Sequence, residues 1–445
     1  MNKKYSFFLL RIFLVVIIQN ILFNSAYAQD SKKIIGLKQA IEATLENNKN
    51  IQLAKIEENI ATANYKQTDA IYLPQINLSY TALNSNNPLN AFGFKLQQRL
   101  VSQADFNPEL LNHPSNTSDF STKLEIQQPL FNLDLLYSRK AALKQTEIYK
   151  FKTQRTKEYL TYLVKKAYQQ LALSYNAVDV LEDALQTSKA VYKYANDHYQ
   201  QGIIQKTDVL NSQVYISTVE KELATAKNNI ANASDLLSNL MGNSLGTIYT
   251  INKKDSLLEK ENISFNKLSL TRADFVAMQK AIEANNLMIE SYKKSNLPKV
   301  NAFGNYQLND NKILGFGANS YLAGIQVSWN IFNGNKTKNQ IATQTLESNK
   351  LSQNLAKQIE ESELELNKTT RDLEVGIFEI KQHETAVEYA TEALRIIKNR
   401  YQQGLVNTTD VLTSASQLLQ QKFALIQSIH RVNDTKAYIQ FLTSN

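Results

Sequence analysis

A duplicated turn motif constrains this sequence more than any other feature. Tyr199-Gln-Gln-Gly202 is followed, after five further residues, by Asp208-Val-Leu210, and Tyr401-Gln-Gln-Gly404 is followed in the same way by Asp410-Val-Leu412. The copies are offset by 401 minus 199, or 202 residues. An internal repeat of this kind indicates that the two halves of the chain fold around the same unit.

The segments after each turn carry a seven-residue apolar spacing. The two rows are Val209, Ile216, Leu223, Ile230 and Leu237, and Val411, Leu418, Leu425, Val432 and Ile439. A spacing sustained this long predicts helices over 208–241 and 410–442 that supercoil with their neighbours in a left-handed sense.

Before each turn, a related spacing predicts a longer helix, over 134–200 and 335–402. The first would be about 100 Å long at 1.5 Å per residue, which no compact globule needs. The rows of these helices that would face neighbouring helices, here called seams, contain small and polar residues as well as leucine. Such a composition favours helices packed side by side in a hollow barrel.

Four short segments alternate apolar and polar residues, which is the period of a β-strand. We expect strands over 74–83, 120–131, 299–308 and 321–332, each about as long as a membrane-spanning strand. Four strands cannot close a barrel around a useful pore, and open sheet edges are not tolerated in lipid. A membrane barrel would therefore need several chains, and three would supply twelve strands. A soluble sheet with one buried face is the alternative that alternation leaves open.

The first residues have the layout of an export signal. Lys3 and Lys4 precede an apolar stretch from Phe7 to Ile18, and Ala26-Tyr27-Ala28 offers a cleavage site. We therefore expect residues 1–28 to be removed, with a retained membrane anchor as the alternative.

The expected elements divide the exported chain into a first repeat over 29–241, a linker over 242–270 and a second repeat over 271–445. The segment 83–120, between the first two strands, is rich in Asn, Ser and Pro and is typical of a surface loop. After residue 28 no apolar run is long enough for a membrane-spanning helix.

The composition excludes several classes of protein. The chain has no cysteine, so disulfides cannot stabilise it. Its net charge of +8 comes from positive and negative side chains that alternate along helical patterns. Nucleic-acid-binding proteins instead cluster their basic residues, so we expect no nucleic-acid partner.

Several marks together make the sequence similar to the TolC-like outer-membrane efflux factors. They are Leu37-x-x-Ala40, Leu-Pro at 73–74 and at 297–298, Arg272-x-Asp274, and the two turns. The resemblance implies a mainly α fold with a small β part. Long helical hairpins would form a periplasmic α-barrel, and four strands per chain would contribute to a twelve-stranded transmembrane β-barrel in a homotrimer. The linker would belong to an equatorial belt around the tunnel.

The resemblance also implies a function and a location. The chain would be the channel subunit of a tripartite efflux or type I secretion system, a passive gated conduit for small molecules or polypeptides. It would lie in the outer membrane of a Gram-negative-type bacterium, in contact with lipid and with a large periplasmic part. Its partners would be a periplasmic adaptor (membrane fusion) protein and an inner-membrane transporter.

The sequence shows no motif for catalysis. Phosphate-binding loops, nucleophile elbows and zinc motifs are absent from it, so we expect no enzyme activity, cofactor or metal. The main alternative function is a secreted periplasmic coiled-coil adaptor or scaffold. Such a protein would be expected to carry a lipoyl-like or small β-barrel module, and the sequence contains no pattern for one.

The candidate site consists of the two turns. Gly202 and Gly404 follow the long seams, where glycine readily takes the left-handed conformation that ends a helix. Asp208 and Asp410 would cap the returning helices. The resemblance implies a second role, in which Asp410 of the second turn faces the channel axis. Three copies would then form a carboxylate ring that favours cations, and Asp208 is the equivalent residue of the first turn.

Tyr199 and Tyr401 end their seams, where they would either pack or form hydrogen bonds that keep the tip shut. Related channels often have a second acidic residue and a basic residue near this turn, but here Thr413 and Val406 occupy those positions. We therefore expect a gate held more weakly or by other contacts. The resemblance implies that the adaptor docks on the exposed tips.

Overall fold

The computed structural model describes residues 33–251 and 267–444. The predicted export signal over 1–28 and most of the linker predicted over 242–270 lie outside these residues. Two compact units cut across the sequence repeats. Unit 1 combines the chain up to Gln52 with Thr156–Ser269 and Ser362–Asn445, and unit 2 combines Leu53–Arg155 with Leu270–Glu361. Each repeat therefore contributes residues to both units.

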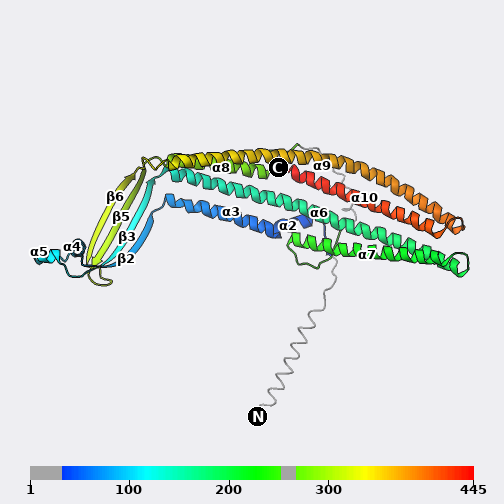
Figure 1. Ribbon diagram of the computed structural model, residues 1–445, viewed down its shortest axis with the longest axis horizontal. Coiled ribbons are helices and arrows are strands. Elements are labelled where there is room, and N and C mark those ends of the chain that lie inside the picture. Colours follow the sequence, from blue (N-terminus) through cyan, green and yellow to red (C-terminus); the bar gives the residue numbers. More distant parts are fainter. Residues whose placement is uncertain (1–32, 252–266, 445) are drawn as a thin grey trace, which may run out of the picture. The chain divides into compact units, whose positions relative to one another are not determined.

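Unit 2 contains an antiparallel sheet of four strands in the order β2-β3-β5-β6 (Figure 1). The strands span Gln75–Ser85 (β2), Thr117–Phe131 (β3), Lys299–Asp310 (β5) and Ala318–Ser328 (β6). β2 and β5 each begin directly after a proline, Pro74 or Pro298. Proline has no N–H for a ladder, so it marks the boundary of a strand.

The two longest helices contribute residues to both units. They are α6 (Leu133–Gln200, 68 residues) and α9 (Lys336–Gln402, 67 residues). Unit 2 also holds α8 (Ala273–Lys294) and most of α3 (Lys49–Gln67), which leads into a short 3-10 turn, η1 (Thr68–Ile71). Among the described residues, no helix has both the length and the apolar character needed to cross a membrane.

Between β2 and β3 the structure contains helices where the sequence indicated only a loop. They are α4 (Pro88–Gln97), η2 (Gln103–Phe106) and α5 (Pro108–Asn112). The Asn87 side chain accepts hydrogen bonds from the N–H groups that open α4, and Asn107 accepts one at the start of α5. Each asparagine is followed by proline, a helix-start signal that would have revealed both helices.

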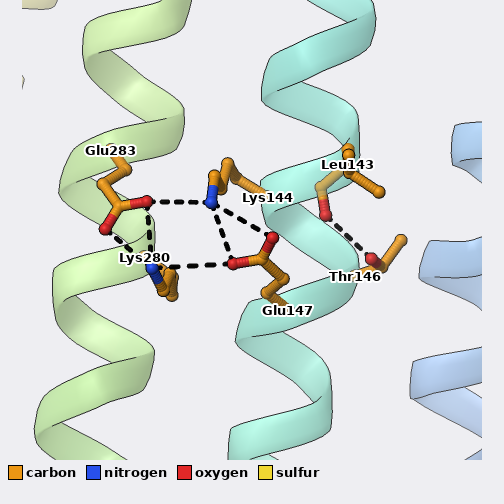
Figure 2. Close-up of polar contacts among 6 residues, drawn as sticks. All are labelled: Leu143, Lys144, Thr146, Glu147, Lys280 and Glu283. Carbon is orange, nitrogen blue, oxygen red and sulfur yellow. Dashed lines mark hydrogen bonds and ion pairs between the residues drawn. The ribbon is translucent and has the colours of Figure 1, made fainter.

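Alternating charges join α6 to α8 in unit 2. Lys144 Nζ lies 3.0 Å from carboxylate oxygens of both Glu147 and Glu283, and Lys280 Nζ lies 2.8 Å from Glu283 and 3.7 Å from Glu147 (Figure 2). Hydrogen bonds to Glu147 and then Glu283 raise the pKa of Lys144, and the bond from Lys280 lowers the pKa of Glu283. Because each lysine meets both carboxylates, the four groups form one network rather than isolated surface pairs.

Unit 1 consists of two helical hairpins and a small parallel pair of strands. The hairpins join α6 to α7 (Lys206–Met241) and α9 to α10 (Thr408–Leu442). The unit also holds the helix α2 (Leu37–Asn47), and its paired strands are β1 (Lys33–Ile34) and β4 (Tyr249–Thr250). The rows with heptad spacing are mostly buried. In α7 the buried members of the row are Val209, Leu223, Ile230 and Leu237, and Val219, Ala226 and Ala233 are buried as well.

Small residues let the helices of unit 1 approach closely. A Cβ at Gly376 of α9 would lie 2.8 Å from Cγ2 of Val432 on α10, so this crossing has no room for a side chain. Ser188 and Ser212 are buried at 1% and 0% exposure in the first hairpin. Their hydroxyls donate to backbone carbonyls of their own helices, which satisfies a polar group inside the seam.

A close junction lies where the end of α7 meets the end of α2, just before α3 begins. The Asn48 side chain donates to the Leu240 carbonyl (2.7 Å) and accepts from the Asn50 N–H (2.8 Å). Gly242 ends α7 with a φ of 69°, and a Cβ there would lie 2.7 Å from the Asn47 carbonyl oxygen. The junction therefore needs glycine for two reasons, conformation and space.

We predict that Gly242→Ala destabilises the protein more than Gly246→Ala. Gly246 also has a positive φ, 90°, but nothing lies within 4 Å of an added Cβ, so it controls for backbone conformation alone. The left-handed conformation costs alanine about 1–2 kcal/mol at both positions, and the clash at Gly242 adds about 1–3 kcal/mol. Thermal unfolding followed by circular dichroism measures the difference, and equal losses would contradict a tight junction.

Candidate functional site

Both tip turns end the preceding helix in the same way. Gly202 has a φ of 75° and Gly404 of 71°. In the second turn the Leu405 N–H donates to the Arg400 carbonyl (2.9 Å) and the Gly404 N–H to the Tyr401 carbonyl (3.0 Å), and the first turn repeats this spacing. This is the Schellman motif, which satisfies the last carbonyls of a helix and needs a left-handed residue. The duplicated glycines therefore make the turns tight.

The two aspartates occupy the same helical position but differ in their partners. In the second turn Asn407 is the N-cap: its side chain accepts from the Asp410 N–H (2.9 Å), and the Asp410 carboxylate accepts from the Asn407 N–H (3.1 Å). In the first turn Gln205 is the N-cap and its side chain makes no capping bond. The capping box is therefore closed only in the second turn, and Asp410 is its third helical residue rather than its N-cap.

A tyrosine of the α6–α7 hairpin holds the turn between α9 and α10, here called the second tip. The Tyr194 hydroxyl of α6 lies 3.2 Å from the Tyr401 carbonyl and 3.3 Å from the Gln402 carbonyl, to which it donates. Its ring centroid lies 4.6 Å from that of Tyr401 and 3.9 Å from that of His198. These contacts hold the end of α9 against α6 within unit 1.

Tyr401 itself is buried at 6% exposure and shares a hydrogen bond of 2.8 Å with the Thr408 hydroxyl across its own turn. Burial, first of all, raises the pKa of Tyr401, and the charges of Tyr194 and Asp208 raise it further, while the bond to Thr408 lowers it. Of the predicted residues, Tyr401 is thus held by contacts with α6 and with its own turn.

Tyr199 behaves differently from its repeat partner Tyr401. Its side chain is 40% exposed, and the buried residues near the end of α6 are Val191 and Ala195. The buried row of α6 was predicted to end at Tyr199, but in the structure it does not include this residue. Tyr194 lies outside the heptad spacing, so periodicity does not mark it. Asn407 is as good an N-cap residue as aspartate, and its place three residues before Asp410 is the sequence signal for the capping box.

The sheet of unit 2 is a second candidate surface, because its apolar face is exposed. The register aligns the apolar side chains of β2 with those of β3, and those of β5 with those of β6. The exposed members include Ile76 (65%), Leu78 (69%), Tyr321 (82%), Ile325 (68%) and Val327 (65%). The opposite face carries Lys123, Glu125, Asn305 and Gln307. A soluble sheet buries such an apolar face, and a sheet in lipid exposes it.

In the part of the chain that the structure describes, no group of three or more His, Cys, Asp or Glu side chains is placed to hold a metal ion.

A family model decides the identity of this architecture. The model described as "Outer membrane efflux protein" matches residues 40–243 and 265–442, which is most of the chain. The chain belongs to this family. It is a subunit of an outer-membrane efflux channel, as predicted, and the predicted location in the outer membrane is confirmed. The family is one of conduits rather than enzymes.

Solved structures of similar fold are also outer-membrane channels. CusC matches with a TM-score of 0.76 and 18% identity over 92% of both chains. CmeC of Campylobacter jejuni matches at 0.77 and 15%, covering 92% of this chain and 85% of that one. The open state of MtrE of Neisseria gonorrhoeae matches at 0.75 and 15%, over 92% and 88%. These likenesses confirm the predicted mainly α fold with a small β part. Among curated protein sequences, no relative matches.

We predict that Tyr194→Phe loosens the second tip of this efflux protein. The change removes only the hydroxyl that donates to the two carbonyls at the end of α9, while the ring contacts stay. A neutral hydrogen bond contributes about 1 kcal/mol, so amide exchange around residues 400–408 should become about fivefold faster. Tyr199→Phe removes an exposed hydroxyl from the same helix and is the matched control. Equal exchange in both variants would argue against Tyr194 as the tie.

Proposed function

We propose that three copies of this chain form a passive, gated conduit that carries small molecules or polypeptides out through the outer membrane. The observation that supports it best is the sheet of unit 2, whose apolar face is exposed and whose edge strands β2 and β6 have no partner in the described chain. Unpaired backbone groups are too costly in lipid, so neighbouring chains must pair with both edges. Three chains would close a barrel of twelve strands.

The helical hairpins would form the periplasmic tunnel, with their tips as the closed end. The turns after α6 and α9 expose Ile203 (61%) and Leu405 (61%), apolar side chains that a periplasmic adaptor protein would cover on docking. An inner-membrane transporter would supply the energy, since we assign no catalysis to this chain.

Oligomeric state and location test the conduit directly. The mature protein should fractionate with the outer membrane and migrate on gels as a trimer that resists SDS until heated. In planar bilayers the purified trimer should produce discrete conductance steps. A soluble monomer without channel activity would overturn the proposal.

Asp410 is proposed to form a ring of three carboxylates at the constriction. Its side chain is exposed, and the capping box with Asn407 fixes its direction at the start of α10. A fixed ring of three negative charges favours cations in a narrow pore. Asp208 would act nearby as the equivalent group of the first turn.

We predict that Asp410→Asn lowers the ratio of cation to anion permeability severalfold, since it removes the charge and keeps an oxygen that can accept the Asn407 N–H. Asp208→Asn, at the same position of the other repeat, should have the smaller effect. Asn407→Ala opens the capping box but keeps the charge, so it should raise conductance and preserve selectivity. Reversal potentials in a salt gradient measure all three, and unchanged selectivity in Asp410→Asn would exclude the ring.

A further inference from the structure

The two connections at one end of the sheet fold onto opposite faces of it. The β2–β3 connection packs on the polar face, where Gln98 donates to the buried Asp119 carboxylate (2.9 Å). The β5–β6 connection over 311–317, here called the outer loop, turns the other way: its Leu314 N–H donates to the Tyr80 hydroxyl (3.0 Å). Tyr80 lies on the apolar face of β2, which it shares with the residues two and four positions before it. The outer loop is therefore held on the apolar side of the sheet.

The Asp310 side chain fixes the backbone of the outer loop. Its carboxylate accepts from the Lys312 N–H (3.0 Å) and from the Gly317 N–H (2.8 Å). The Gly315 N–H donates to the Lys312 carbonyl (3.0 Å), and a Cβ at Gly315 would collide with the Asp310 carboxyl group. Leu314 is held at a φ of 54°, a conformation that leucine adopts only where its surroundings impose it. The loop therefore has one built shape and is not a slack connection.

This fixed loop exposes three large apolar side chains. Ile313, Leu314 and Phe316 are 73%, 67% and 57% exposed, and they continue the exposed apolar face beside Tyr80. A cluster of this kind marks a surface that contacts a membrane or another protein. Lys312, which is also exposed, favours the membrane. A lysine can reach a phosphate head group while its apolar neighbours enter the acyl chains.

The connectivity places the outer loop at the end of the sheet away from the long helices. The strand ends at 75, 131, 299 and 328 lead through short connections to helices, whereas the outer loop joins the opposite strand ends (Figure 1). If the helices form the periplasmic tunnel, these opposite ends face the outside of the cell. Because the loop also lies on the apolar face, it meets the outer leaflet of the membrane and not the lumen.

Exposed aromatic side chains mark the depth of the outer loop. Tyr80 is level with Asn319 of β6 through the strand pairs, and Trp329 follows Asn319 by ten residues. Ten residues of strand extend about 34 Å, and at a barrel tilt of about 40° they span about 26 Å of membrane. Outer-membrane barrels have an apolar band about 25 Å tall between two aromatic girdles. Tyr80 and the outer loop therefore lie at the outer girdle, where acyl chains meet head groups.

We propose that the outer loop is a lipid anchor, which inserts Ile313, Leu314 and Phe316 among the acyl chains of the outer leaflet and places Lys312 at the phosphate head groups. The anchor holds each subunit at a fixed depth, because the hydrogen bond to Tyr80 fixes the loop on the sheet. The proposal rests on the proposed function, since the apolar face meets lipid only in a closed barrel. Three loops, one from each subunit, then contact the outer leaflet around the barrel.

The test measures contact of the loop with lipid. Because the chain has no cysteine, Ile313→Cys supplies a unique thiol for a bimane fluorophore. The labelled protein is reconstituted in vesicles of phosphatidylcholine and phosphatidylglycerol, with and without a lipid that carries a nitroxide just below its head group. Quenching should be at least about threefold stronger than at Leu89→Cys, because an interfacial anchor enters the acyl boundary. Leu89 is 82% exposed on α4, in the connection that packs on the polar face, and is the matched control.

A third thiol, Ile325→Cys, reports on the apolar face of the sheet itself. A nitroxide deep in the acyl chains should quench it, since Ile325 lies between the two aromatic levels. If Ile325→Cys is quenched and Ile313→Cys is not, the anchor is wrong and the channel stands. If neither is quenched, the sheet does not face lipid, and the anchor and the channel are both wrong.

A second pair of variants tests whether the loop is held in place. Tyr80→Phe removes only the hydroxyl that accepts the Leu314 N–H, and one neutral hydrogen bond shifts a local equilibrium about fivefold. Quenching at Ile313→Cys should therefore weaken. Tyr306→Phe removes a hydroxyl from the same face that makes no hydrogen bond within the described chain, so quenching should not change. Equal quenching in the two variants would overturn the fixed placement of the anchor.

Discussion

The apolar face of the four-stranded sheet has no protein partner within the described chain, and the rest of the architecture depends on that constraint. Each exposed Ile, Leu or Val side chain on that face forgoes about 1.5–3 kcal/mol that burial away from water would provide. Lipid provides that burial, but it also forbids the two open edges. The same sheet therefore implies a membrane and an assembly together.

The helices meet a different demand, since they must stay regular over 67 or 68 residues without a wide apolar core. The helices pack by approaching one another closely and not by filling a core with large side chains. Glycine, alanine and serine occupy seam positions, and Gly376 lies directly against Val432. Within unit 1, the junction at Asn48 and Gly242 likewise brings the end of α7 against the end of α2 with no room for a side chain at Gly242.

Much of this was accessible from sequence because it rests on periodicity. The heptad rows predicted the buried residues of α7, and the duplicated glycines marked both turns, since few other residues adopt a positive φ. The misses have local causes. The helices between β2 and β3 follow from two Asn-Pro pairs, which lie in a segment whose composition is otherwise that of a loop. Tyr194 lies off the seam, and its importance depends on the three-dimensional approach of α9. Asp119 is buried at 2% exposure beside Gln98, which donates a hydrogen bond to it, and no spacing encodes that contact.

The unequal capping of the two tips gives the duplicated fold a built-in mechanical asymmetry. A closed capping box contributes about 1 kcal/mol to the first turn of a helix, and only α10 has one, through Asn407 and Asp410. The start of α7 lacks that contribution and frays more readily. Under an equal load, the first turn of α7 should therefore open before the first turn of α10.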